Sequence, residues 1–315
     1  MSLITGAVTT YGTTTNREDL SDVVYRISPA DTPFMSAVPR VSSSAVLHEW
    51  STQALQSINT TNAAVEGDDF QRAASTTPVR RSNVCQISKR NATVTGTQRA
   101  VNPAGIDDML AHQMSLKSLE LRRDMEAILL GNTGQNAGAT NAARTLRSFN
   151  AWFAGNALRG TGGADSTAAT AAATDATTGS LRTFSEILLQ SAILAAYEDG
   201  GEPTMVLVGP RNKQIFSTFT GRTTSQQIVS ADRVLGAASI YASDFGDLMV
   251  KPNRSQRSRD VYVVDPTKVA VAYLRPFQSL EAGSVGDAVT RELLAEYTLE
   301  MRHPDAHAMI ADTNA

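Results

Sequence analysis

The sequence has little of what most chemical functions require. Its 315 residues include one cysteine, Cys85, and four histidines. A single thiol cannot form an intrachain disulfide, and it cannot build a cysteine-based zinc site unaided. We therefore expect a reducing compartment. Because Cys85 lies in a β-rich segment, we interpret it as an ordinary packed residue and not as a reactive thiol.

Charged residues are also scarce. Asp, Glu, Lys and Arg make up 19% of the chain, below the roughly 25% that is usual for soluble domains. The 28 basic and 31 acidic residues give a net charge of −3. This balance argues against a general polyanion-binding protein, since binding to nucleic acid is driven by an excess of Lys and Arg. The shortage of charged residues indicates that part of the surface is covered by other protein.

Long apolar runs are absent. No run approaches the roughly 20 residues that span a bilayer, and residues 1–6 lack the charged and apolar regions of a secretory signal. The sequence therefore predicts a soluble chain that is neither exported nor anchored. At 42% hydrophobic residues it still has enough apolar material for a core, which excludes disorder of the whole chain.

Motifs of catalysis and metal binding are missing. No Gly-Lys dipeptide occurs, which excludes a Walker-type phosphate loop, and the Gly-x-Ser-x-Gly elbow of serine hydrolases is absent. His303 and His307 are four residues apart, but Pro304 lies between them in a strand-like context, which favours a turn over a metal site. His48 has no candidate nucleophile in an activating context. We expect no catalytic residue, no cofactor and no metal.

The first hundred residues predict segments that are unstable alone. Residues 1–45 are rich in Thr, Ser and Gly and interrupted by prolines, which indicates an extended arm with one short helix around 17–25. A strand at 46–52 and an extended region at 79–97 flank a long polar tract. An isolated two-stranded hairpin buries too little to be stable in water. Both segments therefore need a neighbouring surface.

A long helix is predicted next, over 103–130. Asn102 is a suitable cap, Pro103 suits the first helical position, and Gly131 with Asn132 ends the helix. At 1.5 Å per residue it would span roughly 42 Å, which indicates an elongated molecule. The following residues, 132–180, are rich in Gly, Ala, Asn and Thr, and we interpret them as an insertion or loop and not as core.

The remaining sequence alternates between helical and strand patterns. A capping pattern at Thr183 to Glu186 begins a helix that ends at Gly200-Gly201, and a second helix is expected at 211–219. Strands are expected at 205–208, 248–250, 261–264, 269–273, 293–301 and 306–310. The whole pattern predicts an α+β chain with extended arms.

Several short segments, through their order and spacing, resemble a family of tailed-phage major capsid proteins. They are Tyr11-Gly12 with Asn16-Arg17-Glu18-Asp19-Leu20-Ser21-Asp22, Ile27-Ser28-Pro29-Ala30-Asp31-Thr32-Pro33-Phe34-Met35-Ser36, His48-Glu49-Trp50, Tyr241-Ala242-Ser243-Asp244-Phe245-Gly246, Val261 to Pro266, Leu274-Arg275-Pro276, and Gly286-Asp287 leading to Glu296-Tyr297-Thr298-Leu299-Glu300.

The resemblance implies an HK97-like major capsid fold, with five parts along the chain. They are an N-terminal arm (1–45), an extended loop (46–100), a peripheral domain (101–180) with a spine helix at 103–130 and a low-complexity insertion, an axial domain (181–285), and the C-terminal strands of the peripheral domain (286–315).

The resemblance also implies the function. We expect a structural protein that self-assembles through hexamers and pentamers into an icosahedral shell around phage dsDNA, which it contacts non-specifically. It would be assembled in the host cytoplasm, would reside in the virion, and could engage scaffolding, portal and decoration proteins. Some relatives crosslink Lys to Asn, but no crosslinking acid is identifiable beside any of the five lysines here, so we expect noncovalent assembly.

Large aromatic and basic side chains in the arm and loop are the candidate intersubunit contacts. Aromatic side chains bury much area per ordered group, and arginines can form ion pairs across an interface. The candidates are Phe34, Trp50, Phe70, Arg80 and Arg81. For the aromatics, packing in the core of their own subunit is an equally good interpretation.

Three other functions stay open at this stage. A nanocompartment shell of the same fold would hold protein cargo in place of DNA. A hydrolase would need a pocket with converging titratable groups, and no such set is identifiable. A nucleic-acid-binding module would show affinity that falls steeply with salt, and the net charge predicts little binding by the free subunit.

Overall fold

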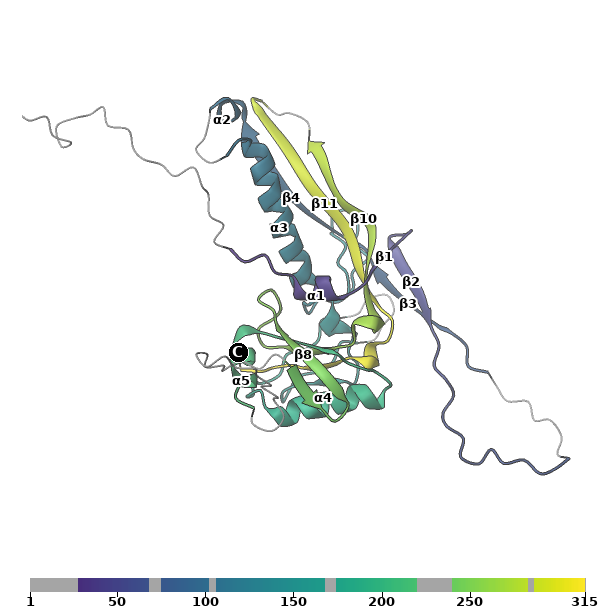
Figure 1. Ribbon diagram of the computed structural model, residues 1–315. Coiled ribbons are helices and arrows are strands. Elements are labelled where there is room, and N and C mark those ends of the chain that lie inside the picture. The colour runs from purple at the N-terminus through teal and green to yellow at the C-terminus, as the bar shows by residue number, and fades with distance from the viewer. Residues whose placement is uncertain are drawn as a thin grey trace, which may run out of the picture.

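The computed structural model of the protein describes residues 28–67, 75–101, 106–167, 174–219, 240–282 and 286–314. An elongated upper part contains long strands beside a long helix, and a rounded lower part contains a second sheet with shorter helices (Figure 1). A hairpin leaves the junction between the two parts and continues into a long loop that extends away from the body.

The upper part is built on a four-stranded sheet in the order β1-β10-β11-β4. The two long strands, β10 (Val269–Ala282) and β11 (Ala288–Met301), pair antiparallel. β4 (Gln86–Thr95) pairs antiparallel with β11, and β1 (Arg40–Ser42) pairs parallel with β10. The strand predicted at 269–273 thus runs on to Ala282, with register shifts between Tyr273 and Gln278.

The long helix α3 (Met109–Leu129) is six residues shorter at its start than predicted. It begins at Met109 because the Asp108 carboxylate accepts a hydrogen bond from the backbone N–H of Leu110 at 2.8 Å, which satisfies one of the helix's unpaired donors. The predicted cap, Asn102, lies outside the described residues. The 21 residues span about 32 Å, and Leu121, Met125 and Leu129 are fully buried on one face.

The lower part contains a six-stranded sheet in the order β5-β12-β9-β6-β8-β7. The strands are β5 (Ala157–Leu158), β6 (Met205–Val208), β7 (Ile240–Ser243), β8 (Gly246–Pro252), β9 (Val261–Val264) and β12 (Ala308–Ile310). Every residue of β6 and β9 is buried, as expected of central strands covered on both faces.

This sheet separates two hydrophobic clusters. Alternation along the strands places Met205, Leu207 and Tyr262 in the cluster that contains α3 and the upper sheet. Val206 and Val208 belong to the other cluster, with α4 (Glu186–Glu198) and α5 (Pro210–Phe216). One sheet therefore joins the two parts of the molecule through its two faces.

The prediction that residues 132–180 contribute no core is wrong for 146–153. Leu146, Phe149 and Phe153 are at most 1% exposed. The ring of Phe149 lies 5.3 Å from that of Tyr262 and 5.7 Å from that of Phe34. Aromatic side chains bury large areas even without a regular period, so a tract rich in small residues can still provide the centre of a core.

The end of the chain holds the rest of this tract in place. Asp312 is buried, with φ at +61°, and its Oδ2 accepts hydrogen bonds from the N–H groups of Gly160 at 3.1 Å and Gly179 at 2.9 Å. Its Oδ1 lies 3.2 Å from a guanidinium nitrogen of Arg259. A Cβ at Gly160 would lie 2.1 Å from the carbonyl oxygen of Ser180, so this close approach of two backbone segments requires glycine.

His307 lies in the core between the two parts. Its side chain is fully buried, its Nδ1 accepts a hydrogen bond from the N–H of Asp265 at 3.0 Å, and its ring lies 5.3 Å from that of Phe149. Burial lowers the pKa of His307 to about 4, despite the opposing effect of nearby Asp265. The neutral form of His307 is therefore part of the folded state.

We expect Phe149→Ala to lower the free energy of unfolding by about 4 kcal/mol, because it removes the ring at the centre of the cluster and leaves a cavity. Phe245→Ala is the matched control, since that ring is 42% exposed, and its cost should be about 1 kcal/mol. Urea unfolding of the unassembled subunit measures both. Equal losses would contradict the placement of Phe149 in the core.

We expect the unassembled subunit to lose stability as the pH falls from about 6.5 to about 4. In this window the unfolded chain protonates His307 while the folded chain does not, so acid favours unfolding, by up to about 3 kcal/mol. Urea unfolding at several pH values measures the loss. In His307→Gln, the amide oxygen can still accept the hydrogen bond from the N–H of Asp265, but the side chain no longer titrates. The loss of stability between about pH 6.5 and 4 should therefore be smaller in this variant. An equal loss in the variant and the unchanged protein would contradict the role of His307.

Candidate intersubunit surfaces

The loop beyond the hairpin is uncovered along its whole described length. The hairpin consists of β2 (Leu47–Thr52) and β3 (Val79–Val84), and every described residue from 53 to 80 is exposed. Three apolar side chains lie in this loop with nearly all of their surface in water: Leu55 is 96% exposed, Ile58 92% and Val65 78%. Burying each fully would contribute about 1.5–3 kcal/mol.

The described part of this loop forms local hydrogen bonds. Gln53 donates to the Thr76 carbonyl at 2.9 Å, and the hydroxyl of Thr61 donates to Asn59 at 2.9 Å. Every described residue between 53 and 78 is exposed. The loop is therefore a surface that its own chain does not cover.

The base of the hairpin, in contrast, is firmly attached to the core. The indole N–H of Trp50 donates to the Met301 carbonyl at 3.0 Å. The buried amide of Asn83 donates to the Leu299 carbonyl at 2.8 Å, and its oxygen accepts from the N–H of Arg147 at 2.8 Å. The hairpin thus leaves the body at a fixed position and direction.

Arg147 is the least expected member of this attachment. It is only 6% exposed, its guanidinium lies 4.3 Å from the ring centre of Trp152, and it donates to the Ala151 carbonyl at 2.7 Å. Burial, together with nearby Arg81, lowers the pKa of Arg147 to about 10. The guanidinium remains charged at neutral pH, and the cation–π contact and carbonyl compensate for the water it has lost.

A second polar attachment joins β2 to the end of β11. The imidazole of His48 lies 2.8 Å from one carboxylate oxygen of Glu300, and Arg302 donates to the other oxygen at 2.8 Å. Burial alone would raise the pKa of Glu300, but Arg302 and His48 outweigh it, so this pKa lies below its usual value. Glu300 is therefore held as a carboxylate.

The sequence-predicted contacts have different surroundings. Phe34 is fully buried in the core of its own chain. Trp50 is half-buried, with its ring 5.7 Å from that of Trp152. Arg80 is exposed and lies 3.5 Å from Glu49, and Arg81 donates to the Thr52 hydroxyl at 3.3 Å. Phe70 lies outside the described residues. Of these candidates, Arg80 is exposed and Trp50 and Arg81 are partly exposed.

Phe34 is held by a buried carboxylate. It lies in α1 (Pro33–Ala37), where Glu126 of α3 accepts hydrogen bonds from the N–H groups of Phe34 at 2.8 Å and Met35 at 2.9 Å. The side-chain amide of Asn253, just after β8, donates to the same carboxylate at 2.8 Å. Burial raises the pKa of Glu126, and the three donors act against that rise.

The sequence patterns did not reveal the exposed apolar residues of the loop or the buried carboxylate of Glu126. Leu55, Ile58 and Val65 are single apolar residues in a polar tract, so no periodicity reveals them. Glu126 lies on a helix among other charged residues, and nothing local distinguishes it.

Neither a metal centre nor a membrane segment is found in the described residues. They contain no group of three His, Cys, Asp or Glu side chains placed to hold a metal ion. Among them, too, no helix has the length and apolar character needed to cross a bilayer. Cys85 is buried, with its sulfur 3.6 Å from the Ala45 carbonyl oxygen, and burial raises the pKa of its thiol.

Comparison with known proteins gives the family. Over residues 7–314 the sequence matches the SU10 major capsid protein family. A curated relative, the major capsid protein of Escherichia phage Phieco32, is 36% identical over 104 residues, which are 33% of this chain and 30% of that protein. This chain thus matches under a third of the length of that relative. The chain belongs to the SU10 major capsid protein family.

Solved structures agree on the fold. A chain from Microbacterium phage Oxtober96 is similar with a TM-score of 0.64 at 14% identity, covering 95% of this chain and 96% of that chain. The capsid of a native GTA particle is similar with a TM-score of 0.63 at 10% identity, covering 96% and 97%. The fold is therefore the HK97-like α+β capsid fold that the sequence resemblance implied.

We expect Glu126→Ala to lower the free energy of unfolding by about 3 kcal/mol or more, because three buried donors lose their acceptor at once. The matched control is Asp124→Ala on the same helix, whose carboxylate is partly exposed and pairs with Arg90. That change should cost about 1 kcal/mol or less. Urea unfolding of the unassembled subunits measures both, and a loss at Glu126 no larger than at Asp124 would contradict the junction described above.

Proposed function

We propose that this member of the SU10 major capsid protein family associates with copies of itself into a closed icosahedral shell around phage dsDNA. The observation that carries the proposal is the loop from 53 to 78. It projects from a rigid base, carries apolar side chains that its own chain leaves in water, and is too long to be a simple turn. In the shell, this loop packs against a neighbouring copy of the chain, which buries its apolar side chains.

The remaining architecture fits repeated association. Many moderate contacts, each repeated around a shell, stabilise a closed assembly even when one contact is weak. In this proposal residues 1–45 are the arm and 46–100 the extended loop. The upper sheet with α3 is the peripheral domain, and the lower sheet with α4 and α5 is the axial domain, around which hexamers and pentamers form.

Family membership supports the contents and location of the shell. The curated relative is named as a major capsid protein of a phage, and on that basis this chain belongs in the virion, after assembly in the host cytoplasm. With a net charge of −3, it encloses dsDNA without sequence-specific contact. Scaffolding, portal and decoration proteins are the further partners of this proposal, and its role is structural and not enzymatic.

Two measurements test the proposal: the size of the particles that the purified protein forms, and the concentration at which a loop variant assembles. We expect light scattering and negative-stain microscopy to show closed particles hundreds of ångströms across, whereas a compact monomer of this length has a radius of gyration of roughly 20 Å. Leu55→Ser, Ile58→Ser and Val65→Ser combined should raise the concentration needed for assembly more than tenfold, since over 1.4 kcal/mol of burial is lost.

The matched control is Ala54→Ser, Ala63→Ser and Ala64→Ser, which adds the same side chain in the same loop without removing a large apolar group. It should assemble at the concentration of the unchanged protein. If the unchanged protein stays a compact monomer under every assembly condition, the proposal is wrong. Particles filled with protein cargo and free of DNA would assign the shell to a nanocompartment.

A further inference from the structure

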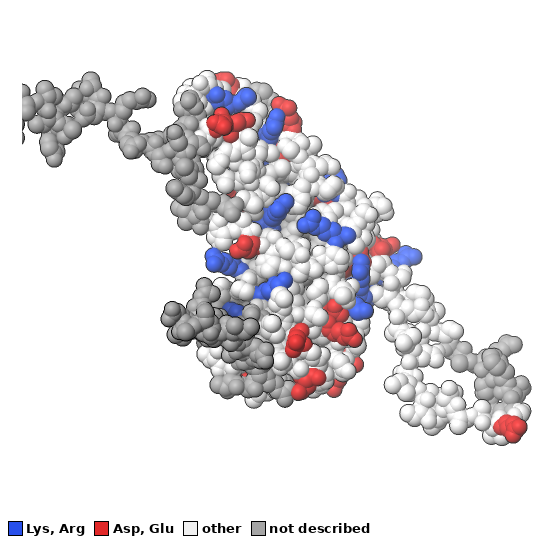
Figure 2. Space-filling model, viewed as in Figure 1, with Lys and Arg blue, Asp and Glu red and all other residues white. Residues whose placement is uncertain are grey.

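Positive charge gathers on one face of the hairpin base. The strand register pairs Trp50 of β2 with Arg81 of β3, so both side chains lie on the same face of the hairpin. The ring of Trp50 lies 5.7 Å from that of Trp152, and the guanidinium of the buried Arg147 lies 4.3 Å from the ring centre of Trp152. Two arginines therefore flank one pair of contacting tryptophans. Figure 2 shows basic side chains where the hairpin leaves the body.

The two arginines repel each other in a place with little water. Burial, and after it the charge of Arg81, lowers the pKa of Arg147 to about 10. Arg81 itself is half-buried, so an ion from the solvent can reach it. In the described part of the chain its guanidinium forms one hydrogen bond, from Nε to the Thr52 hydroxyl at 3.3 Å. The other N–H donors of Arg81 are therefore available to a further partner.

No carboxylate among the described residues forms an ion pair with either of these arginines. Glu300, at the end of β11, is held by His48 and by Arg302, each at 2.8 Å. Glu49 lies between two residues that face the body, so its side chain is on the opposite face of the hairpin, where it lies 3.5 Å from Arg80. The positive charge at the hairpin base is therefore unmatched, which is unfavourable for groups that have lost water.

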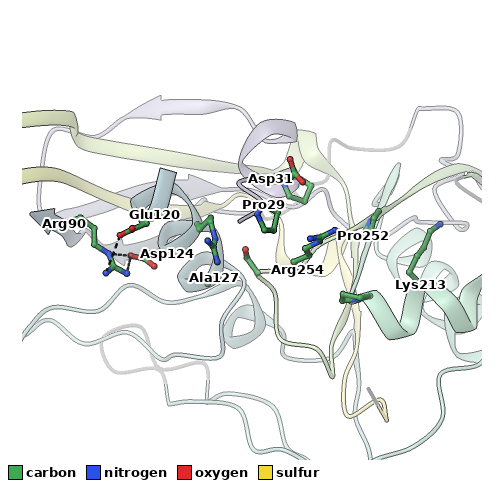
Figure 3. A pocket seen from close by; sticks show the side chains of 13 residues that line it. Pro29, Asp31, Arg90, Glu120, Asp124, Ala127, Lys213, Pro252 and Arg254 are labelled. Carbon is green, nitrogen blue, oxygen red and sulfur yellow. Dashed lines mark hydrogen bonds and ion pairs between the residues drawn. The ribbon is translucent and has the colours of Figure 1, made fainter. Parts of the chain in front are cut away.

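A cleft of about 570 Å³ between α3, the arm and α5 provides a contrast. Its charged lining residues are Arg90, Arg123, Lys213, Arg254, Asp31, Glu120 and Asp124 (Figure 3). Arg90 lies 2.7 Å from Asp124 and 4.0 Å from Glu120. Charges of both signs offset each other there, so the cleft favours neither a cation nor an anion. The hairpin base, in contrast, favours an anion.

We propose that the hairpin base binds inorganic phosphate through the guanidinium of Arg81, and that the charge of Arg147 adds to the attraction. The planar fork of an arginine matches two phosphate oxygens with parallel hydrogen bonds. Two neighbouring cations favour a ligand with more than one negative charge, as inorganic phosphate has near neutral pH, over a carboxylate or a phosphodiester, which has one. The bound ion offsets the repulsion between the two arginines. The site lies within one subunit, so it goes beyond the proposed shell function and does not rest on it.

Tryptophan fluorescence reports on this site directly, because Trp50 and Trp152 are the two tryptophans of the chain. The full chain, below the concentration at which it assembles, is titrated with sodium phosphate at about pH 7.5. Sodium chloride keeps the ionic strength constant, so that general screening does not change along the titration. We expect a saturable change in fluorescence with half-saturation at millimolar phosphate, since a half-buried arginine fork binds an anion only moderately.

Three variants test the role of the guanidinium. Arg81→Gln keeps a donor for the Thr52 hydroxyl but removes the charge, and it should weaken phosphate binding about fivefold or more. Arg81→Lys keeps the charge without the planar fork, and its affinity should lie between the two. The matched control is Arg80→Gln, the adjacent arginine on the opposite face of the hairpin, which should bind phosphate as the unchanged protein does. Circular dichroism checks that each variant is folded.

Three results would overturn the inference. Without a saturable change, there is no phosphate site at the hairpin base. An equal affinity in the folded Arg81→Gln variant would mean an adventitious ion only. If a short DNA duplex changes the fluorescence and free phosphate does not, the surface binds nucleic acid and not the free ion. All of these titrations use the unassembled chain, so they are independent of whether the protein forms shells, which decides the proposed function.

Discussion

The carboxylate of Glu126 is the contact on which the arrangement of the two parts depends. It is fully buried, and it accepts hydrogen bonds from the arm at Phe34 and Met35 and from Asn253 at the edge of the lower sheet. A buried charge is tolerated only when its hydrogen-bonding capacity is used, so all three donors must be present together. Arm, long helix and lower sheet are thereby placed relative to one another.

The two faces of the six-stranded sheet are buried at its central strands, whereas the loop after β2 is exposed to solvent. The six-stranded sheet closes the interior, since its alternate residues fill both hydrophobic clusters. The loop after β2 remains open, although its base is held by Trp50, Asn83 and the pair of His48 with Glu300. A rigid base with an uncovered loop suits association, because little further order has to be imposed on the body when a neighbour binds.

Much of the fold follows from local patterns. The strands at 205–208 and 261–264 were predicted at their observed bounds, because continuous runs of apolar, mostly β-branched residues have few alternatives. Helix starts were less accurate: Asp108 and Ser185 cap α3 and α4, whereas Asn102 and Thr183 were equally suitable by residue type. The core role of Phe149 went unpredicted, since its surroundings in the sequence are small and polar.

Local patterns in the sequence were enough to predict an α+β chain with extended arms, because helix and strand patterns act between neighbouring residues. The order and spacing of several short segments gave the resemblance to phage capsid proteins. The packing of the chain was needed to show that Phe34 is core, that Glu126 joins the arm to the lower sheet, and that Arg123, Lys213 and Arg254 line one cleft. These residues lie far apart along the chain, and no local pattern records which distant groups will meet once the sheet and the long helix have packed.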